Sequence, residues 1–221
     1  MWGLSEPKAL RRPVVRLALP AGTQDLPAAR PLRVGLLGGS FNPAHEGHRY
    51  ISLEAQKRLE LDQVWWLVSP QNPLKARFGM APLAERLARA GAVAHHPRIK
   101  VLDLEARLGT RYTIDTLRRL VLWPGHRFVW LMGADNLVQL PRWRQWRAIF
   151  ATCPVAVFER HPYSHHALAG PAARGFAGAR LSEPRAAELL ATDPPAWVFV
   201  RLRPHPASAT AIRARAGADG G

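Results

Sequence analysis

The sequence predicts an α/β protein in which a Rossmann-like, mainly parallel sheet carries helices on both faces of a single domain. Short apolar runs alternate along the chain with segments that have the apolar spacing of a helix, which is typical of strand–helix–strand units. The chain has 221 residues, of which 48% are hydrophobic, and this suits one domain with a sizeable buried core.

The first half of the chain is predicted to contain two strands and two helices. Residues 33–37 form an apolar run that closes in Gly38-Gly39, as a buried strand does when it feeds a tight turn. Residues 46–59 place apolar side chains at helical spacing, and residues 63–68 form the next strand-like run. Residues 83–93 again have the spacing of a helix.

The middle of the chain continues the alternation. Residues 99–104 are predicted to be a third strand, residues 113–122 a helix and residues 128–132 a fourth strand. Asp135 is expected to cap the helix that follows, and Pro141 to stand at the start of the second part of that helix.

The ends of the chain differ in character. Residues 155–158 and 197–202 are predicted to be the last strands, and the segment 160–180 between them, rich in Gly, Ala, Pro and His, is predicted to be a long loop. Residues 1–31 are basic and rich in proline and have no apolar signal-peptide core. We expect them to form a loosely ordered extension before a domain at residues 32–221.

Charge and cysteine content narrow the class of protein. The chain carries 31 Lys and Arg against 16 Asp and Glu, for a net charge of +15. Its arginines are dispersed, which indicates a compositional bias more than a nucleic-acid surface, with a nucleotide or nucleic acid ligand as the alternative. Cys153 is the only cysteine, which excludes an internal disulfide and a cysteine-based zinc cluster. No apolar run approaches the roughly 18 residues of a membrane helix, so we expect a cytoplasmic protein with no membrane partner.

The most informative segment runs from Gly38 to His48, where the first predicted strand becomes the first predicted helix. Free backbone N–H groups and the positive end of the helix dipole at such a junction suit a phosphate group. His45 and His48 are three residues apart, so both imidazoles lie on one face of a helix start and can donate together to phosphate oxygens. Helix capping or core packing is the structural alternative. A zinc site is the weaker one, because two histidines supply only half of its ligands.

Five segments carry a resemblance to a known family. They are GGSFNPAHEGH at 38–48, SPQNPLK at 69–75, YTIDTL at 112–117, GADNL at 133–137 with Trp143 and Trp146 after it, and SATAIR at 208–213. In this order and spacing the chain resembles the bacterial nicotinate mononucleotide adenylyltransferases, members of the HxGH nucleotidyltransferase superfamily. The resemblance implies a Rossmann-like fold and the transfer of AMP from ATP to nicotinate mononucleotide, which yields deamido-NAD and pyrophosphate.

The resemblance also implies which residues bind each substrate. It assigns catalytic roles to His45, His48 and Arg213. The implied ATP-binding set is Gly38, Gly39, Ser40, Phe41, His45, His48, Ser208, Thr210 and Arg213, and the implied acceptor-binding set is Asn42, Lys75, Tyr112, Thr113, Asp135 and Trp143. The Trp143 indole would stack on the pyridine ring, and backbone amides near Tyr112 and Thr113 would receive its carboxylate.

The residues themselves leave structural alternatives open for several members of these sets. Asp135 could serve only as a helix cap, Trp143 and Trp146 could pack on the core, and Lys75 could be a solvated loop lysine.

Adenylyl transfer suits these residue types, because the attacking group is already a phosphate oxygen and no activated Ser, Cys or Lys is needed. The barrier is lowered by alignment and by stabilisation of charge on the departing pyrophosphate. Mg²⁺ held mainly by the ATP phosphates and water is expected as the cofactor. Another HxGH nucleotidyltransferase, of the phosphopantetheine or cytidylyl type, is one alternative, and a basic nucleic-acid-binding module is the other. The oligomeric state stays open.

Overall fold

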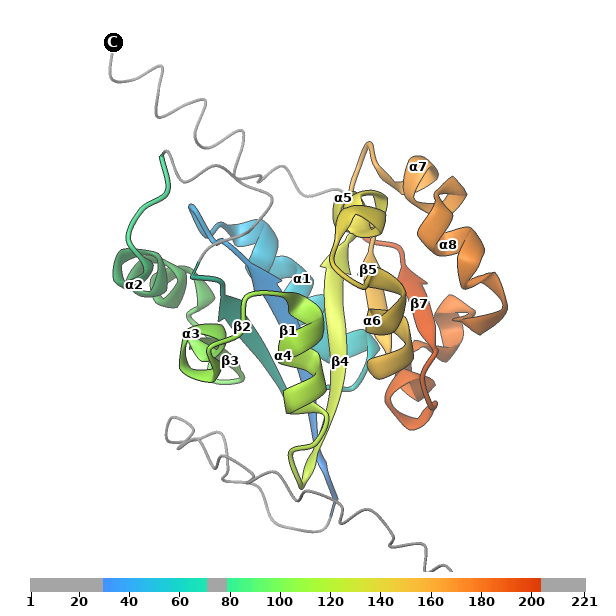
Figure 1. Ribbon diagram of the computed structural model, residues 1–221, viewed down its shortest axis with the longest axis horizontal. Coiled ribbons are helices and arrows are strands. Elements are labelled where there is room, and N and C mark those ends of the chain that lie inside the picture. The colour runs from blue at the N-terminus through green and yellow to red at the C-terminus, as the bar shows by residue number, and fades with distance from the viewer. Residues whose placement is uncertain (1–29, 71–78, 204–221) are drawn as a thin grey trace, which may run out of the picture.

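The computed structural model describes residues 30–70 and 79–203, which build one sheet of seven parallel strands (Figure 1). The strands lie in the order β3-β2-β1-β4-β5-β7-β6, and every neighbouring pair is parallel. Their bounds are Leu32–Gly39 (β1), Gln63–Val68 (β2), Ile99–Leu102 (β3), His126–Gly133 (β4), Val155–Phe158 (β5), Arg180–Leu181 (β6) and Trp197–Val200 (β7). The long central strands β1 and β4 pair directly, and the chain order reverses between them.

Helices cover both faces of the sheet. They are α1 (Glu46–Arg58), α2 (Leu83–Ala94), α3 (Leu104–Leu108), α4 (Thr113–Leu120), α5 (Ala134–Gln139), α6 (Trp146–Thr152), α7 (Ser164–Ala169) and α8 (Pro171–Gly175), with 3₁₀ turns at Leu140–Arg142 (η1), Ala177–Ala179 (η2) and Glu183–Ala191 (η3). Apolar residues of α1, α2 and η3 share one core layer, and those of α3 to α8 share the other. This confirms the predicted Rossmann-like α/β fold.

Strand β2 explains why two core layers form. All six of its residues are buried, and because successive strand residues point to opposite faces, Trp65 and Trp66 enter different layers. Both indoles are 0% exposed. Each indole N–H is satisfied locally, that of Trp65 by Gln63 at 2.8 Å and that of Trp66 by the Ser52 hydroxyl at 2.7 Å.

Several expectations about secondary structure are wrong. Helix α4 ends at Leu120 and strand β7 at Val200, each two residues before its predicted end. The segment 160–180 is not a long loop, because it contains α7, α8 and η2. The third strand does not reach residue 104: it ends at Leu102, and Leu104 begins α3. Asp135 does not cap α5, because Gly133 occupies the N-cap position and Asp135 lies inside the first turn. Pro141 does stand at the start of η1, as expected.

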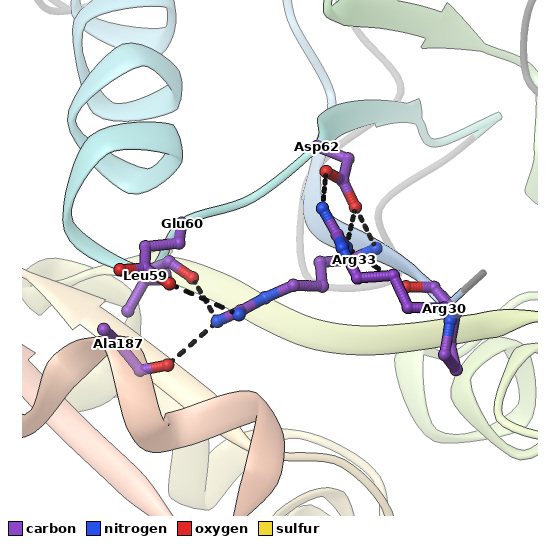
Figure 2. A network of polar contacts seen from close by, with 7 residues as sticks. Arg30, Arg33, Leu59, Glu60, Asp62 and Ala187 are labelled. Atoms are coloured by element: carbon purple, nitrogen blue, oxygen red, sulfur yellow. Dashed lines mark hydrogen bonds and ion pairs between the residues drawn. The ribbon is translucent and has the colours of Figure 1, made fainter. Parts of the chain in front are cut away.

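An arginine network ties α1 and η3 to the amino-terminal end of the central strands (Figure 2). The Arg33 guanidinium donates to the carbonyl oxygens of Leu59 at 2.9 Å and Ala187 at 2.8 Å. Leu59 is the C-cap of α1, so the positive charge meets the negative end of that helix. Burial alone would raise the pKa of Asp62, but hydrogen bonds from Arg30 and from the Arg33 backbone N–H lower it below its ordinary value.

Two sequence-based expectations stay predictions: the loosely ordered extension before residue 32 and the cytoplasmic location. Strand β1 begins at Leu32, but the expected extension lies almost wholly outside the described residues, so the division at residue 31 is not tested. Within residues 30–70 and 79–203, no helix has the length and apolar character to cross a membrane.

Candidate active site

The turn from β1 into α1 stands at the carboxyl end of the sheet, where parallel α/β folds bind their ligands. Phe41 adopts a left-handed backbone conformation with φ of 47°, which costs a non-glycine residue of the order of 1 kcal/mol. Its ring is 2% exposed and stacks on Trp66, with 5.0 Å between ring centroids. Packing against the core therefore holds the backbone of this turn in place.

His45 and His48 meet at the start of α1, as their spacing predicted. His45 is the N-cap, and the ring centroids of the two histidines are 3.8 Å apart. The backbone N–H of His45 donates to Nδ1 of His48 at 3.2 Å. Because Nδ1 is the acceptor, neutral His48 carries its proton on Nε2 and can donate from that atom.

A short relay fixes the first turn of α1. The Trp66 indole N–H donates to the Ser52 hydroxyl, and that hydroxyl donates to the His48 carbonyl oxygen at 2.8 Å. The His48 ring also lies 4.7 Å from the Phe41 ring, centroid to centroid. The imidazole is therefore positioned by aromatic packing as well as by a hydrogen bond, which is the preorganisation that a catalytic donor needs.

The two glycines of the turn have different neighbours. A Cβ at Gly38 would lie 2.3 Å from Cη2 of Trp130, a residue that is 2% exposed, so the buried indole would have to shift. A Cβ at Gly39 would make an ordinary contact of 3.4 Å with the Phe41 ring. Packing thus requires glycine at residue 38. For Gly39, which belongs to the implied ATP-binding set, the proposed reason is close approach of a ligand to the backbone.

Ser40 and Asn42 both take part in joining this turn to neighbouring segments. Ser40 is 9% exposed, and its carbonyl oxygen accepts a hydrogen bond from Arg86 at 2.7 Å. The Asn42 side-chain amide donates to the Gly79 carbonyl at 3.0 Å, and its oxygen accepts from the Ala81 backbone N–H at 3.4 Å. The predicted acceptor-binding role of Asn42 is therefore joined by a structural one.

The expected carboxylate-binding residues lie at the start of α4, where Tyr112 is the N-cap and Thr113 the first helical residue. The first backbone N–H groups of a helix lack intrahelical acceptors and suit an anion. The Arg144 guanidinium lies 4.8 Å from the centre of the Tyr112 ring, and that of Arg111 lies 5.7 Å from it. Positive charge therefore surrounds Tyr112, which favours a carboxylate ligand.

Asp135 and Trp143 follow the carboxyl end of β4 along the chain, in α5 and directly after η1. The Asp135 carboxylate pairs with the Arg160 guanidinium at 2.9 Å. Trp143 follows η1 as its C-cap, is partly buried and packs against the core. Its role as a stacking surface for a pyridine ring stays a prediction. Trp146 begins α6 and packs edge-on against Phe176 at 6.1 Å, so the core-packing alternative holds for it.

Four predicted site residues, Lys75, Ser208, Thr210 and Arg213, lie outside the described residues. Their assignments stay predictions.

Two buried charged residues near the site were not expected from the sequence. Arg86 of α2 is 2% exposed and donates to backbone carbonyls of three chain segments. Glu105 of α3 is 6% exposed; burial raises its pKa to about 7, although a hydrogen bond with Ser69 opposes the shift. Neither belongs to a motif, so only the tertiary structure reveals them.

The described side chains hold no metal cluster, since no three His, Cys, Asp or Glu residues gather there in a group suited to one. The zinc alternative for His45 and His48 therefore gains no third ligand within residues 30–70 and 79–203.

Comparisons with known proteins show the family of the chain. Residues 36–215 match a family model described as cytidylyltransferase-like. A probable nicotinate-nucleotide adenylyltransferase of Cereibacter sphaeroides (strain ATCC 17025) is 56% identical over 182 residues, which cover 82% of this chain and 96% of the relative. One of the same description from Parvibaculum lavamentivorans is 53% identical over 187 residues, covering 84% and 93%.

Solved structures share the fold. The nicotinic acid mononucleotide adenylyltransferase of Plasmodium falciparum, complexed with NaAD, superposes with a TM-score of 0.62 over 83% of each chain. The complex of that enzyme with APC gives a TM-score of 0.60. Sequence identity to both is 14%, so this likeness concerns the fold alone.

Proposed function

The chain belongs to the cytidylyltransferase-like family and, within it, to the nicotinate-nucleotide adenylyltransferases, and we propose that it transfers AMP from ATP to nicotinate mononucleotide in NAD biosynthesis. The products are nicotinate adenine dinucleotide and pyrophosphate. The observation that carries the mechanism is the His45–His48 pair, in which one backbone hydrogen bond leaves Nε2 of His48 as a proton donor. ATP is made and used in the cytoplasm, which is where we place the reaction.

The reaction is an in-line displacement at the α-phosphorus of ATP. A phosphate oxygen of nicotinate mononucleotide forms the new P–O bond, and the bond to the β-phosphate oxygen breaks as pyrophosphate leaves. Negative charge grows on the departing group, and donors fixed in advance at that position lower the barrier. His45 and His48 are the described residues that we assign to this task, and Arg213, with Ser208 and Thr210, would hold the β- and γ-phosphates.

Mg²⁺ bound to the phosphates of substrate ATP would neutralise part of their negative charge.

The acceptor would lie between Tyr112–Thr113 and Trp143. The amino-terminal N–H groups of α4 offer donors to the ring carboxylate, and Arg144 adds positive charge beside Tyr112. Trp143 would cover the pyridine ring, while Asn42, Lys75 and Asp135 complete the proposed acceptor site.

Identification of the products tests the proposal. We would incubate the purified chain with ATP, Mg²⁺ and nicotinate mononucleotide, and separate the nucleotides by chromatography. We expect nicotinate adenine dinucleotide and pyrophosphate in equal amounts. Formation of AMP and pyrophosphate without a dinucleotide would contradict it, as would turnover only when phosphopantetheine replaces nicotinate mononucleotide or CTP replaces ATP.

A further inference from the structure

Arg86 is a buried cation that the reaction described above does not use. Its side chain is 2% exposed, and within the described residues no carboxylate pairs with it. Burial lowers the pKa of this guanidinium from its ordinary value. A buried charge without a counter-ion is costly, so the groups that surround it indicate what it does.

Those groups are four backbone carbonyl oxygens. Nε donates to Ala81 at 2.8 Å, and Nη1 donates to Ser40 and Ser69, both at 2.7 Å. Nη2 donates to Pro70 at 3.0 Å. The planar fork of the guanidinium can hold such a set in fixed directions, whereas a lysine ammonium cannot.

The carbonyls come from segments that carry the site. Ser40 lies in the turn before His45 and His48, and Ser69-Pro70 begins the segment that leads to Lys75. Arg86 is therefore a direct link between the turn that carries the expected ATP phosphate site and the chain that leaves the carboxyl end of β2. Asn42 makes a second link, because its amide bonds to Gly79 and Ala81.

The hydrogen bond to Ser40 also fixes a peptide plane. The Ser40–Phe41 peptide bond is not among the cis bonds of the chain, so its carbonyl and its N–H point in opposite directions. With the carbonyl held by Arg86, the Phe41 N–H points away from α2. Among the described residues this N–H donates to no backbone carbonyl.

We propose that Arg86 is a positioning residue, which aims the Phe41 N–H at the ATP phosphates and sets the distance between the turn at Ser40 and the segment at Ser69-Pro70. The inference rests on the proposed adenylyl transfer, because it needs two bound substrates that must be aligned. Misalignment raises the barrier more than it weakens the binding of either substrate alone, since displacement requires both partners in line.

The test compares two lysine variants. Arg86→Lys keeps the charge but loses the planar fork, and Arg33→Lys does the same at the opposite end of the sheet, where Arg33 also donates to two carbonyl oxygens. For Arg86→Lys we expect kcat to fall about tenfold or more, with dissociation constants for ATP and acceptor, each measured alone, within about threefold of the unmodified protein. Arg33→Lys should lower the melting temperature and keep kcat within about twofold.

A smaller fall in kcat for Arg86→Lys would overturn the proposal, and so would a change confined to substrate binding. An equal fall in kcat for Arg33→Lys would also overturn it, when each variant is assayed equally far below its own melting temperature. Arg86→Gln is the second variant if the lysine variant does not fold, and failure of both to fold would assign Arg86 to stability alone. The acceptor is chosen first from a panel, with unmodified protein. A preference for another acceptor would contradict the proposed function. The ratio of kcat for Arg86→Lys to kcat for the unmodified protein, measured with that acceptor, would still decide the role of Arg86.

Discussion

Gly38 and Trp130 touch so closely that a Cβ at residue 38 would lie 2.3 Å from Cη2 of the indole. Trp130 lies in β4, the strand next to β1. Core packing therefore requires glycine at the first position of the GGSF segment. The second glycine, Gly39, has ordinary room for a Cβ.

This contact predicts that Gly38→Ala lowers the free energy of unfolding by about 1 to 3 kcal/mol, because an added methyl must displace a buried indole. Gly39→Ala is the matched control and should stay within about 0.5 kcal/mol of the unmodified protein. Urea denaturation measures both. Equal losses of stability in the two variants would show that the indole does not limit residue 38.

The hydrogen bond from the His45 backbone to Nδ1 of His48 predicts that His48 acts through Nε2. His48→Ala and His45→Ala should each raise the barrier by about 2 to 4 kcal/mol, which is about 30- to 1,000-fold in kcat, with the fold retained. His48→Gln, whose amide nitrogen lies as many bonds from Cα as Nε2 of histidine does, should recover part of the lost rate. Near-normal turnover in both folded alanine variants would remove the histidines from the mechanism.

Direct displacement predicts that the enzyme is never adenylylated. Transfer in a single step inverts the configuration at the α-phosphorus, and stereochemical analysis with chiral α-thio-ATP would reveal the inversion. Radiolabel from α-labelled ATP should not remain on the denatured protein. Retained label, or retention of configuration, would instead indicate a covalent intermediate.

Glu105 predicts a pH dependence of stability. Burial raises its pKa to about 7, from an ordinary value of 4.5. In the unfolded chain the carboxyl group loses its proton near pH 4.5, whereas in the folded protein it keeps it until about pH 7. The free energy of unfolding should therefore decrease between these values, by about 3 kcal/mol in total, and be unaffected by this group at higher pH.

Urea denaturation at about pH 5 and about pH 7.5 tests this dependence. Glu105→Gln should lack the decrease that Glu105 causes. Asp62→Asn is the control and should keep the decrease. The pKa of Asp62 is lowered, so its contribution to the free energy of unfolding changes only below about pH 4. The same decrease in Glu105→Gln as in the unmodified protein would refute the assignment.

The sequence predicted the bounds of two fully buried strands correctly, whereas β7, which is also fully buried, ends two residues before its predicted end. Strands β2 and β5 match their predicted bounds, because every residue in them is buried and apolar runs of this kind have few other uses. The segment 160–180 was wrongly predicted because its helices present alanines to the core, such as Ala167 and Ala172, and alanine gives little periodic signal.

The site was predictable only where the chemistry lies within one turn of chain. His45 and His48 are neighbours on a helix start, so their spacing sufficed. Arg86 is one basic residue among 31, and its role depends on three segments that only the folded chain brings together. Glu105 likewise becomes unusual only through burial beside Ser69.

The most direct test of the central claim is the choice of acceptor. Nicotinate mononucleotide carries a ring carboxylate, whereas nicotinamide mononucleotide has an NH₂ donor in place of one acceptor oxygen. The ring carboxylate would accept from the backbone N–H groups at the start of α4. The NH₂ group of the amide would instead face at least one of these N–H donors, a mismatch that costs roughly 1 to 3 kcal/mol. Stacking on Trp143 should be similar for both rings, so Trp143→Ala should weaken both acceptors by similar factors. We therefore measure kcat/KM for the two acceptors with the unmodified protein. The account predicts a clear preference for the acid, and equal values for the acid and the amide would contradict it.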